Sequence, residues 1–182
     1  PPPEVPDTEG LVGLTLKEAL DRYKKSLTAW TGTLRDYPGY RLDLRGTNLQ
    51  GADLSDLNLN TARLDGAQMQ WADLCDAKMR TSSLRGAQMQ WAELRRVQME
   101  GAVCPQANLQ GAILLEAKVQ GAFLGTVTAQ GADFCSTQLQ MATFVGSDLQ
   151  LAAFGSAQLH QACLSGAQLQ RADLTRAQMD DA

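Results

Sequence analysis

The sequence has little of what catalytic and metal sites require. Among 182 residues it contains a single histidine, His160, and its four cysteines form no Cys-x-x-Cys pair. His160 has no suitably placed serine or cysteine that it could activate as a nucleophile. The sequence also lacks a phosphate-binding, glycine-rich loop that leads into a helix. A carboxylate such as Asp180 beside a lone histidine is more often a surface pair than a metal site. The sequence therefore predicts that the protein is not an enzyme, with no catalytic residue, no metal and no cofactor.

Strong charge and long apolar runs are also lacking. The formal net charge is -4, and residues 40–182 carry 11 Lys and Arg against 14 Asp and Glu. Without a concentrated basic surface, direct binding of nucleic acid is not expected. No apolar run approaches the roughly 20 residues needed to cross a bilayer, and the start of the chain has no signal-peptide pattern. The widely spaced cysteines fit free thiols in a reducing compartment, so we expect a cytoplasmic protein.

The sequence does contain a strict period of five residues. Every fifth residue from Leu44 to Met179 is a candidate core position, and the residue two places before it is small and mostly alanine. A period of five fits neither a helix nor a strand, so it predicts a solenoid whose coils repeat as units. Examples are Ala52-Asp53-Leu54, Ala67-Gln68-Met69, Ala107-Asn108-Leu109 and Ala172-Asp173-Leu174.

These pentapeptides resemble those of the pentapeptide-repeat family over about three quarters of the chain. The resemblance implies an all-β solenoid, a right-handed quadrilateral β-helix of about seven coils with four pentapeptides in each. Residues 20 apart would then lie in one column on adjacent coils, about 4.8 Å apart. Five methionines and three phenylalanines fall at the repeated core position, so we expect them to pack inside rather than to bind a ligand: Met69, Met79, Met89, Met99, Met179, Phe134, Phe144 and Phe154.

The chain before the repeats divides into two segments. Residues 1–13 are rich in proline and predict a flexible leader. Residues 14–40 predict a helix and a connection, with capping-box spacing from Thr15 to Glu18 and an apolar stripe that includes Leu20 and Trp30. We expect this helix to cap the first coil, because a solenoid exposes its core at each end. Residues 41–182 form the predicted β-helix.

Two neighbouring surface columns are candidates for a protein-interaction patch. Trp71 and Trp91 are 20 residues apart at an outward position that is usually glycine, so their rings are expected to stack in the open. Beside them lies a column of like charges, Asp53, Asp73 and Glu93, which cross-strand electrostatics disfavours. Exposed tryptophan is enriched in binding hot spots. The alternative is that the tryptophans pack on each other and cover the turns.

The remaining surface columns have simpler interpretations. A weaker interaction candidate is the apolar column of Val103 and Phe123. Columns of alternating sign predict ion pairs between coils, and columns of glutamine predict amide ladders. The charged columns are Arg45-Asp65-Arg85, Asp76-Arg96-Glu116, Arg80-Glu100 and His160-Asp180.

Three functions remain open from the sequence. The first is a non-catalytic scaffold that presents its faces to another protein. The second comes from the resemblance, since some family members imitate the DNA duplex and bind the topoisomerase gyrase; those relatives are strongly acidic, unlike this chain. The third is a structural spacer in a larger bacterial protein, because Ala182 begins a repeat whose centre is absent and leaves open backbone edges. Such an uncapped coil also makes end-to-end self-association an alternative.

Overall fold

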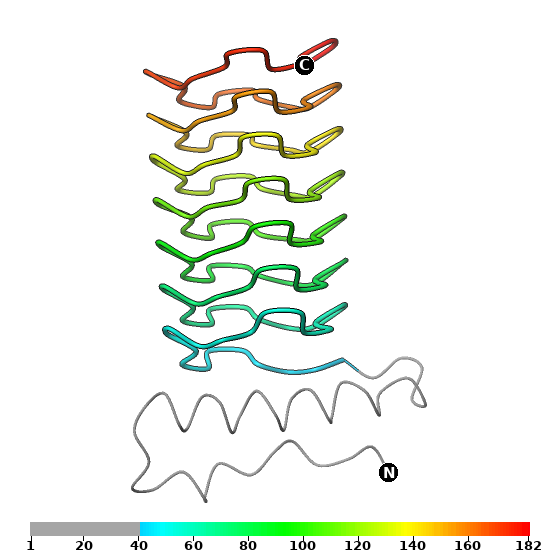
Figure 1. Ribbon diagram of the computed structural model, residues 1–182, viewed down its shortest axis with the longest axis vertical. Coiled ribbons are helices and arrows are strands. Elements are labelled where there is room, and N and C mark those ends of the chain that lie inside the picture. The colour runs from blue at the N-terminus through cyan, green and yellow to red at the C-terminus, as the bar shows by residue number, and fades with distance from the viewer. Residues whose placement is uncertain (1–40) are drawn as a thin grey trace, which may run out of the picture.

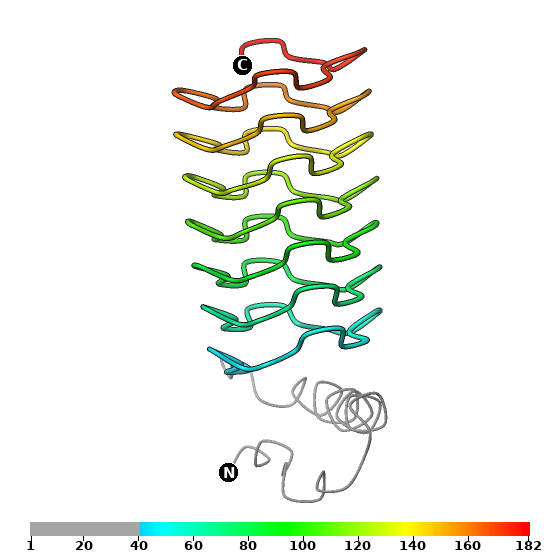
Figure 2. The ribbon, with the colours of Figure 1, turned by 90° about the vertical axis from the view of Figure 1, so that its left-hand side faces the viewer.

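The computed structural model describes residues 41–182 as a column of stacked coils (Figures 1 and 2). Within these residues there is neither an α-helix nor an extended strand, because the coils are joined by isolated single-residue bridges, all parallel. The predicted leader at 1–13 and the predicted capping helix within 14–40 lie outside the described residues. The β character of the solenoid therefore consists of ladders of single bridges rather than of long strands.

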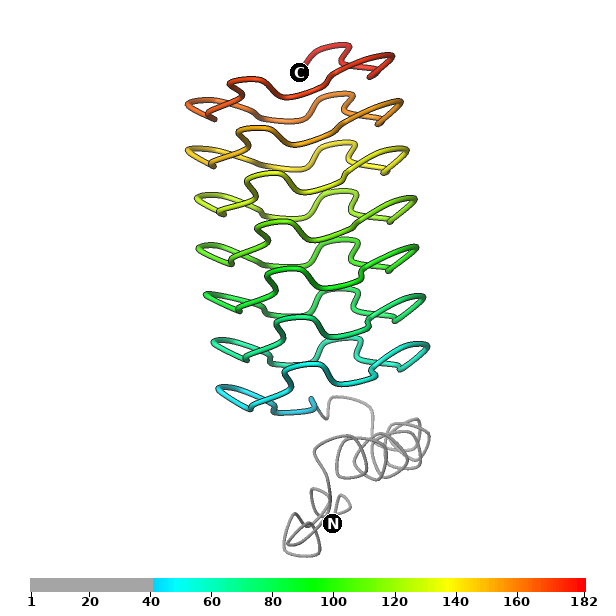
Figure 3. The same ribbon diagram turned by 60° about the vertical axis from the view of Figure 1, so that its left-hand side comes forward.

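The bridges define a coil with four sides. Each bridge joins residues 20 apart. Successive bridges begin five residues apart, so the fifth bridge begins at Arg63, which is the partner residue of the first bridge. The first four bridges are Asp43–Arg63, Asn48–Gln68, Asp53–Asp73 and Asn58–Lys78. We call the sides first to fourth, after the centres Leu44, Leu49, Leu54 and Leu59. Four pentapeptides in each coil are thus confirmed, and the side view in Figure 3 shows the regular stacking.

Each pentapeptide has the same five roles, which Ala52 to Asp56 illustrate. Ala52 is the small residue and Leu54 the centre, and both are buried. Asp53 is the pre-centre residue, Ser55 the post-centre residue and Asp56 the turn residue. The alternation of buried and outward residues confirms the predicted register, including the place where the centre is Ala129 and the larger Val127 occupies the small position.

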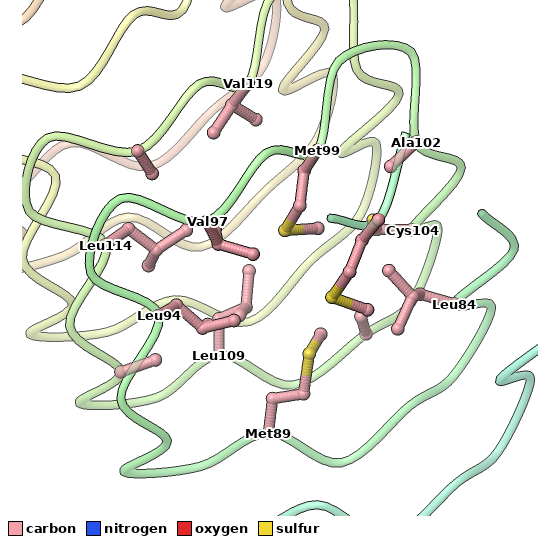
Figure 4. Packing of buried hydrophobic residues seen from close by; sticks show 14 of the residues in the cluster. Leu84, Met89, Leu94, Val97, Met99, Ala102, Cys104, Leu109, Leu114 and Val119 are labelled. Carbon is pink, nitrogen blue, oxygen red and sulfur yellow. The ribbon is translucent and has the colours of Figure 1, made fainter. Parts of the chain in front are cut away.

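The interior is filled by the centre residues of all four sides (Figure 4). The methionines at centres 69, 79, 89 and 99 are fully buried among leucines, as expected for flexible gap-filling side chains. The rings of Phe134 and Phe154 stack at 4.9 Å between centroids, and Phe144 meets both edge-on. The predicted core positions of Met69, Met79, Met89 and Met99 and of the three phenylalanines are confirmed, with Met179 only partly buried.

The turn residue closes every corner of the coil. All turn residues have positive φ, between 52° and 70°, whether or not they are glycine. The amide of Thr47 donates to the carbonyl of Leu44 at 3.3 Å across such a corner. A four-residue turn with positive φ at its third residue matches a type II turn, which favours glycine there. The five-residue period is thus one short side plus one turn.

The backbone amides explain why aspartate and asparagine recur before the centre. In the repeat at Leu64 the other amides find carbonyls of neighbouring coils or of the turn, but the amide of Asp65 finds no backbone acceptor. The same holds for every post-centre residue within 41–182. A pre-centre Asp or Asn fills this gap, because its side-chain oxygen accepts from the amide two residues later. The residues that do so are Asp43, Asn48, Asp53, Asn58, Asp73, Asn108, Asp133, Asp148 and Asp173.

This cap predicts a difference between two pre-centre substitutions. Asp133→Ala removes the acceptor that lies 2.9 Å from the amide of Cys135, so we expect it to lower the free energy of unfolding by about 1 kcal/mol. Lys118→Ala is the matched control at an equivalent position that caps nothing, and it should leave stability within about 0.5 kcal/mol. Denaturant unfolding followed by circular dichroism measures both. Equal losses from the two variants would contradict the capping role.

Candidate functional site

The two tryptophans of the candidate patch occupy the corner between the second and third sides. Trp71 and Trp91 are turn residues with φ of 56° and 60°. Their side chains are 63% and 54% exposed, the highest values of any aromatic residue in 41–182. The local reason for this exposure is the turn itself, because a turn residue points away from the core on every corner.

The expectation that the two indole rings stack on each other is wrong. The ring contacts within residues 41–182 are those of the three core phenylalanines. The indole of Trp91 instead lies over Gly111 of the next coil, where an added Cβ would sit only 2.1 Å from Cζ3. The absence of a side chain at Gly111 leaves the space that this ring fills. The two tryptophans therefore present separate apolar surfaces.

The acidic column beside the tryptophans forms as predicted, but its members have local partners. Bridges place Asp53, Asp73 and Glu93 directly above one another. Asp73 accepts from the amide of Cys75 at 2.9 Å, and Glu93 pairs with the guanidinium of Arg95 at 3.0 Å. Asp53 caps its own repeat in the same way as Asp73. The fold thus uses these carboxylates, and their like charges need no ligand to explain them.

The predicted ion pairs between coils are present in part. Those that form are Arg96–Asp76 at 2.6 Å, Arg80–Glu100 at 3.1 Å and His160–Asp180 at 3.1 Å. Hydrogen bonding to its arginine holds the pKa of Asp76 below its usual value. On the first side the prediction is wrong, since Arg45 pairs within its own repeat with Asp43 at 2.6 Å and lowers the pKa of that carboxyl to about 2. Arg45 thus pairs with the carboxylate on the other side of its own centre residue, Leu44, rather than with Asp65 on the next coil.

The glutamines do not form the straight ladders that the sequence suggests. Most of their mutual hydrogen bonds join residues 18 apart, from a post-centre residue to the pre-centre residue of the next coil, while Gln90 donates to Gln88 of its own repeat. Gln50 donates to Gln68 at 3.4 Å, and Gln150 donates to Gln168 at 3.2 Å. The diagonal direction follows from the side-chain length, which lets each amide reach across the centre residue. The bonds satisfy the amides only in part, because four buried side-chain amide oxygens accept no hydrogen bond within residues 41–182: those of Gln70, Gln90, Gln120 and Gln140.

The weaker interaction candidate, on the first side, includes more exposed apolar residues than the two that the sequence predicts. Val103 and Phe123 are bridged neighbours, and both are exposed. Two further exposed apolar residues are nearby: Val145 lies on the following coil of the same side, and Met141 lies at the corner that leads into it. The sequence carried only part of this signal, because intervals of 20 place Val103 below Phe123 but do not relate that column to those of Met141 and Val145. Leu151, exposed at the same corner position as the tryptophans, was also missed.

Two further kinds of site are absent from the part of the chain that the structure describes. Residues 41–182 contain no group of three His, Cys, Asp or Glu side chains that could hold a metal ion. In the same range no helix is long and apolar enough to span a membrane. The two candidate sites are exposed apolar surfaces, one at the corner of Trp71 and Trp91 and the other on the first side.

A model of the pentapeptide repeat family, describing eight copies of the repeat, matches residues 43–80, 92–128 and 152–182. These segments make up more than half of the sequence. The chain belongs to the pentapeptide-repeat family. The right-handed quadrilateral β-helix of this family agrees with the four-sided path of the bridges.

Several solved structures of pentapeptide-repeat proteins resemble this chain. One from the thylakoid lumen of Arabidopsis thaliana is 23% identical, with a TM-score of 0.42 over 59% of this chain and 68% of that chain. HetL from the cyanobacterium Nostoc is 24% identical, with a TM-score of 0.32 over 80% and 92%. QnrB1, a plasmid-mediated fluoroquinolone resistance protein, is 20% identical, with a TM-score of 0.35 over 74% and 83%. At these values the likeness carries no functional argument. Among curated proteins, none matches the sequence.

The contact between Trp91 and Gly111 predicts that two glycine substitutions differ. Gly111 and Gly131 both have φ of 63°, so alanine at either costs about 1–2 kcal/mol of backbone strain. Only Gly111→Ala drives its Cβ into the Trp91 indole, whereas nothing lies within 4 Å at Gly131. We expect the tryptophan emission to change in Gly111→Ala and to match the parent in Gly131→Ala. The same emission spectrum for both variants would contradict the ring position.

The four thiols should differ in reactivity. Hydrogen bonding to Ser165 lowers the pKa of the exposed Cys163, while burial raises the pKa of Cys104 to about 12. Burial and the neighbouring Asp73 raise the pKa of Cys75 to about 11, and Cys135 shifts in the same direction. Because the thiolate is the reactive form, iodoacetamide at pH 8 should label Cys163 first and Cys104 only after unfolding. Peptide mapping by mass spectrometry measures the order, and early labelling of Cys104 would contradict it.

Proposed function

We propose that the chain is a non-catalytic protein–protein interaction scaffold, a rigid rod of about seven coils that presents its surfaces to another protein. The observation that carries the proposal is the pair of exposed tryptophans, Trp71 and Trp91, at corners where the backbone favours glycine. We assign them as the centre of the main binding surface, with Asp53, Asp73 and Glu93 at its edge.

The backbone gives no reason for tryptophan at these corners. An L-residue with positive φ costs about 1–2 kcal/mol relative to glycine. Gly51 precedes the two tryptophans in the same column and Gly131 follows them, so the corner itself accepts glycine. More than half of each indole remains exposed to water, so burial within the chain recovers only part of the hydrophobic free energy. A partner that covers both rings would recover the rest.

The surroundings of the tryptophans suit a protein partner. Tryptophan is over-represented among residues that dominate interface energies, and such residues lie near the centre of a contact. The acidic column runs along one flank, where charges contribute more to orientation and association rate than to affinity. Since Asp53 and Asp73 also cap the backbone, their substitution would disturb the coil, whereas substitution of the tryptophans would not.

A scaffold also needs a surface that does not rearrange on binding. The bridges between coils run without a break from Asp43 to Gln178, and the centre residues are fully buried over most of the rod. Side chains held on such a frame lose little conformational entropy when a partner binds. Pentapeptide-repeat proteins are generally interaction or structural proteins rather than enzymes, in agreement with a non-catalytic role.

The two other functions have less support. Imitation of duplex DNA for gyrase binding requires a dense array of negative charge, but acids such as Asp76 and Glu100 are paired with arginines on the neighbouring coil. A passive spacer requires no exposed tryptophan at all. Capture of binding partners from a lysate distinguishes both functions from a scaffold.

The test compares the parent with a Trp71→Gly/Trp91→Gly double variant in affinity capture from a native lysate. Glycine suits the positive φ of both corners, so the variant should fold at least as well as the parent. Leu151→Gly is the matched control, because Leu151 is an exposed turn residue of the same column with φ of 60°. We expect one partner to be captured by the parent and by Leu151→Gly but lost by the double variant.

The alternative results are equally informative. Identical profiles for parent and double variant would overturn the proposed tryptophan surface. Capture of gyrase subunits, confirmed by an effect of the purified chain on gyrase supercoiling, would favour imitation of DNA. A profile with no specific partner in any sample would favour the spacer.

A further inference from the structure

We propose that the first side of the rod carries a second docking surface, which binds an acidic amphipathic helix of another protein. The surface consists of an apolar ridge, defined by Val103, Phe123 and Val145, with Arg85 at one end. It goes beyond the proposed function, because it lies on a different side from the tryptophan corner and does not depend on it.

The ridge is continuous because of one glycine. Val103 is a pre-centre residue and Val145 a post-centre residue two coils later, so they stand in different columns. Phe123 belongs to the coil between them, and its ring lies across Gly125, with Cζ 3.1 Å from the place where a Cβ would be. The ring thus crosses from one column to the other. Together with the two valines, the ring forms a diagonal strip that is exposed on three successive coils.

Charge is distributed unevenly along this side. From Gly101 to Gly166 none of the outward residues of the first side and its two corners is charged. Nearer the start, by contrast, Asp43 is paired with Arg45 at 2.6 Å and with Arg63 at 3.5 Å. An uncharged apolar strip therefore adjoins a charged region, and the boundary between them falls at Arg85.

Arg85 is the group that specifies the partner's charge. The neighbouring carboxylate, Asp65, accepts from the hydroxyl of Ser83 at 2.5 Å and from the backbone amide of Arg85 at 3.0 Å. The Arg85 guanidinium has no ion pair with any residue of 41–182, unlike Arg45, Arg80 and Arg96. A carboxylate from a partner can form a bidentate pair with such a guanidinium, which gives both direction and specificity.

The dimensions of the surface favour a helix that lies along the rod. Arg85 and Val145 are post-centre residues three coils apart, which corresponds to about 14 Å at an inter-coil spacing of about 4.8 Å. A helix covers that length with about nine residues. Apolar side chains at i, i+3 and i+7 would cover the ridge, and an Asp or Glu about one turn beyond would meet Arg85.

The experiment selects peptides from a phage-displayed library of random 16-residue sequences on the full chain, after depletion on the Phe123→Ser variant. Enriched peptides are synthesised with a fluorescent label, and their Kd values are measured by anisotropy. We expect them to combine a helical apolar stripe with Asp or Glu at one end. Phe123→Ser should weaken binding about tenfold or more, since the ring joins the ridge, and the Trp71→Gly/Trp91→Gly variant should bind like the parent.

Charge reversal tests the role of Arg85. Arg85→Glu should weaken the same peptides by about tenfold, and replacing their acidic residues with lysine should restore binding to this variant but not to the parent. Phe123 and Arg85 are exposed, so both variants should keep the circular dichroism of the parent. Val145→Thr is a second ridge variant in case Phe123→Ser misfolds.

Three results would overturn the proposal. The first is the absence of enriched peptides. The second is enrichment of peptides that lack acidic residues or that bind Arg85→Glu and Val145→Thr as tightly as the parent. The third is concentration-dependent self-association that Phe123→Ser abolishes, because a second copy of the chain would then be the occupant of the ridge.

Discussion

The fold depends on a backbone turn with positive φ at every fifth residue. Each turn ends one short side and begins the next, so four turns return the chain to the same column one coil higher. Because every coil follows the same path, carbonyls and amides of adjacent coils meet at 2.7–3.1 Å along most of the rod. In nine repeats, an aspartate or asparagine before the centre satisfies the post-centre amide that this arrangement leaves without a backbone acceptor.

The same constraint divides the side chains into two sets. The small residue and the centre face a closed interior, where leucine, methionine and phenylalanine can exchange with one another provided that the volumes compensate, as at Val127 and Ala129. The other three positions face outward and tolerate many residues. Function must therefore be sought where an outward residue is costly or has no structural partner, as with Trp71 at a positive-φ corner and the guanidinium of Arg85.

The two proposed surfaces differ in physical character. The tryptophan corner offers two separate indole faces beside carboxylates that already serve the fold. The ridge on the first side is aliphatic and aromatic, and the ring of Phe123 crosses it over Gly125. It is bordered by Arg85, whose guanidinium has no ion pair within residues 41–182. The corner after Met69 and the first side lie on different parts of the perimeter. The rod therefore has room for two partners at once.

By itself the sequence determined the solenoid, its register and its core, because a five-residue period has no other regular structure that buries every centre. The resemblance to the family, which implies four pentapeptides in each coil, also placed Trp71 above Trp91 and Asp53 above Asp73, since residues 20 apart then share a column. The tertiary structure decided what the side chains do within these columns. Stacking of the indoles and pairing of Arg45 with Asp65 were wrong, because side-chain direction depends on local space, such as that above Gly111, and on the nearest carboxylate, which is Asp43. Val103 and Val145 stand in different columns, and the ring of Phe123 lies between these columns over Gly125. The five-residue period does not predict the direction of that ring.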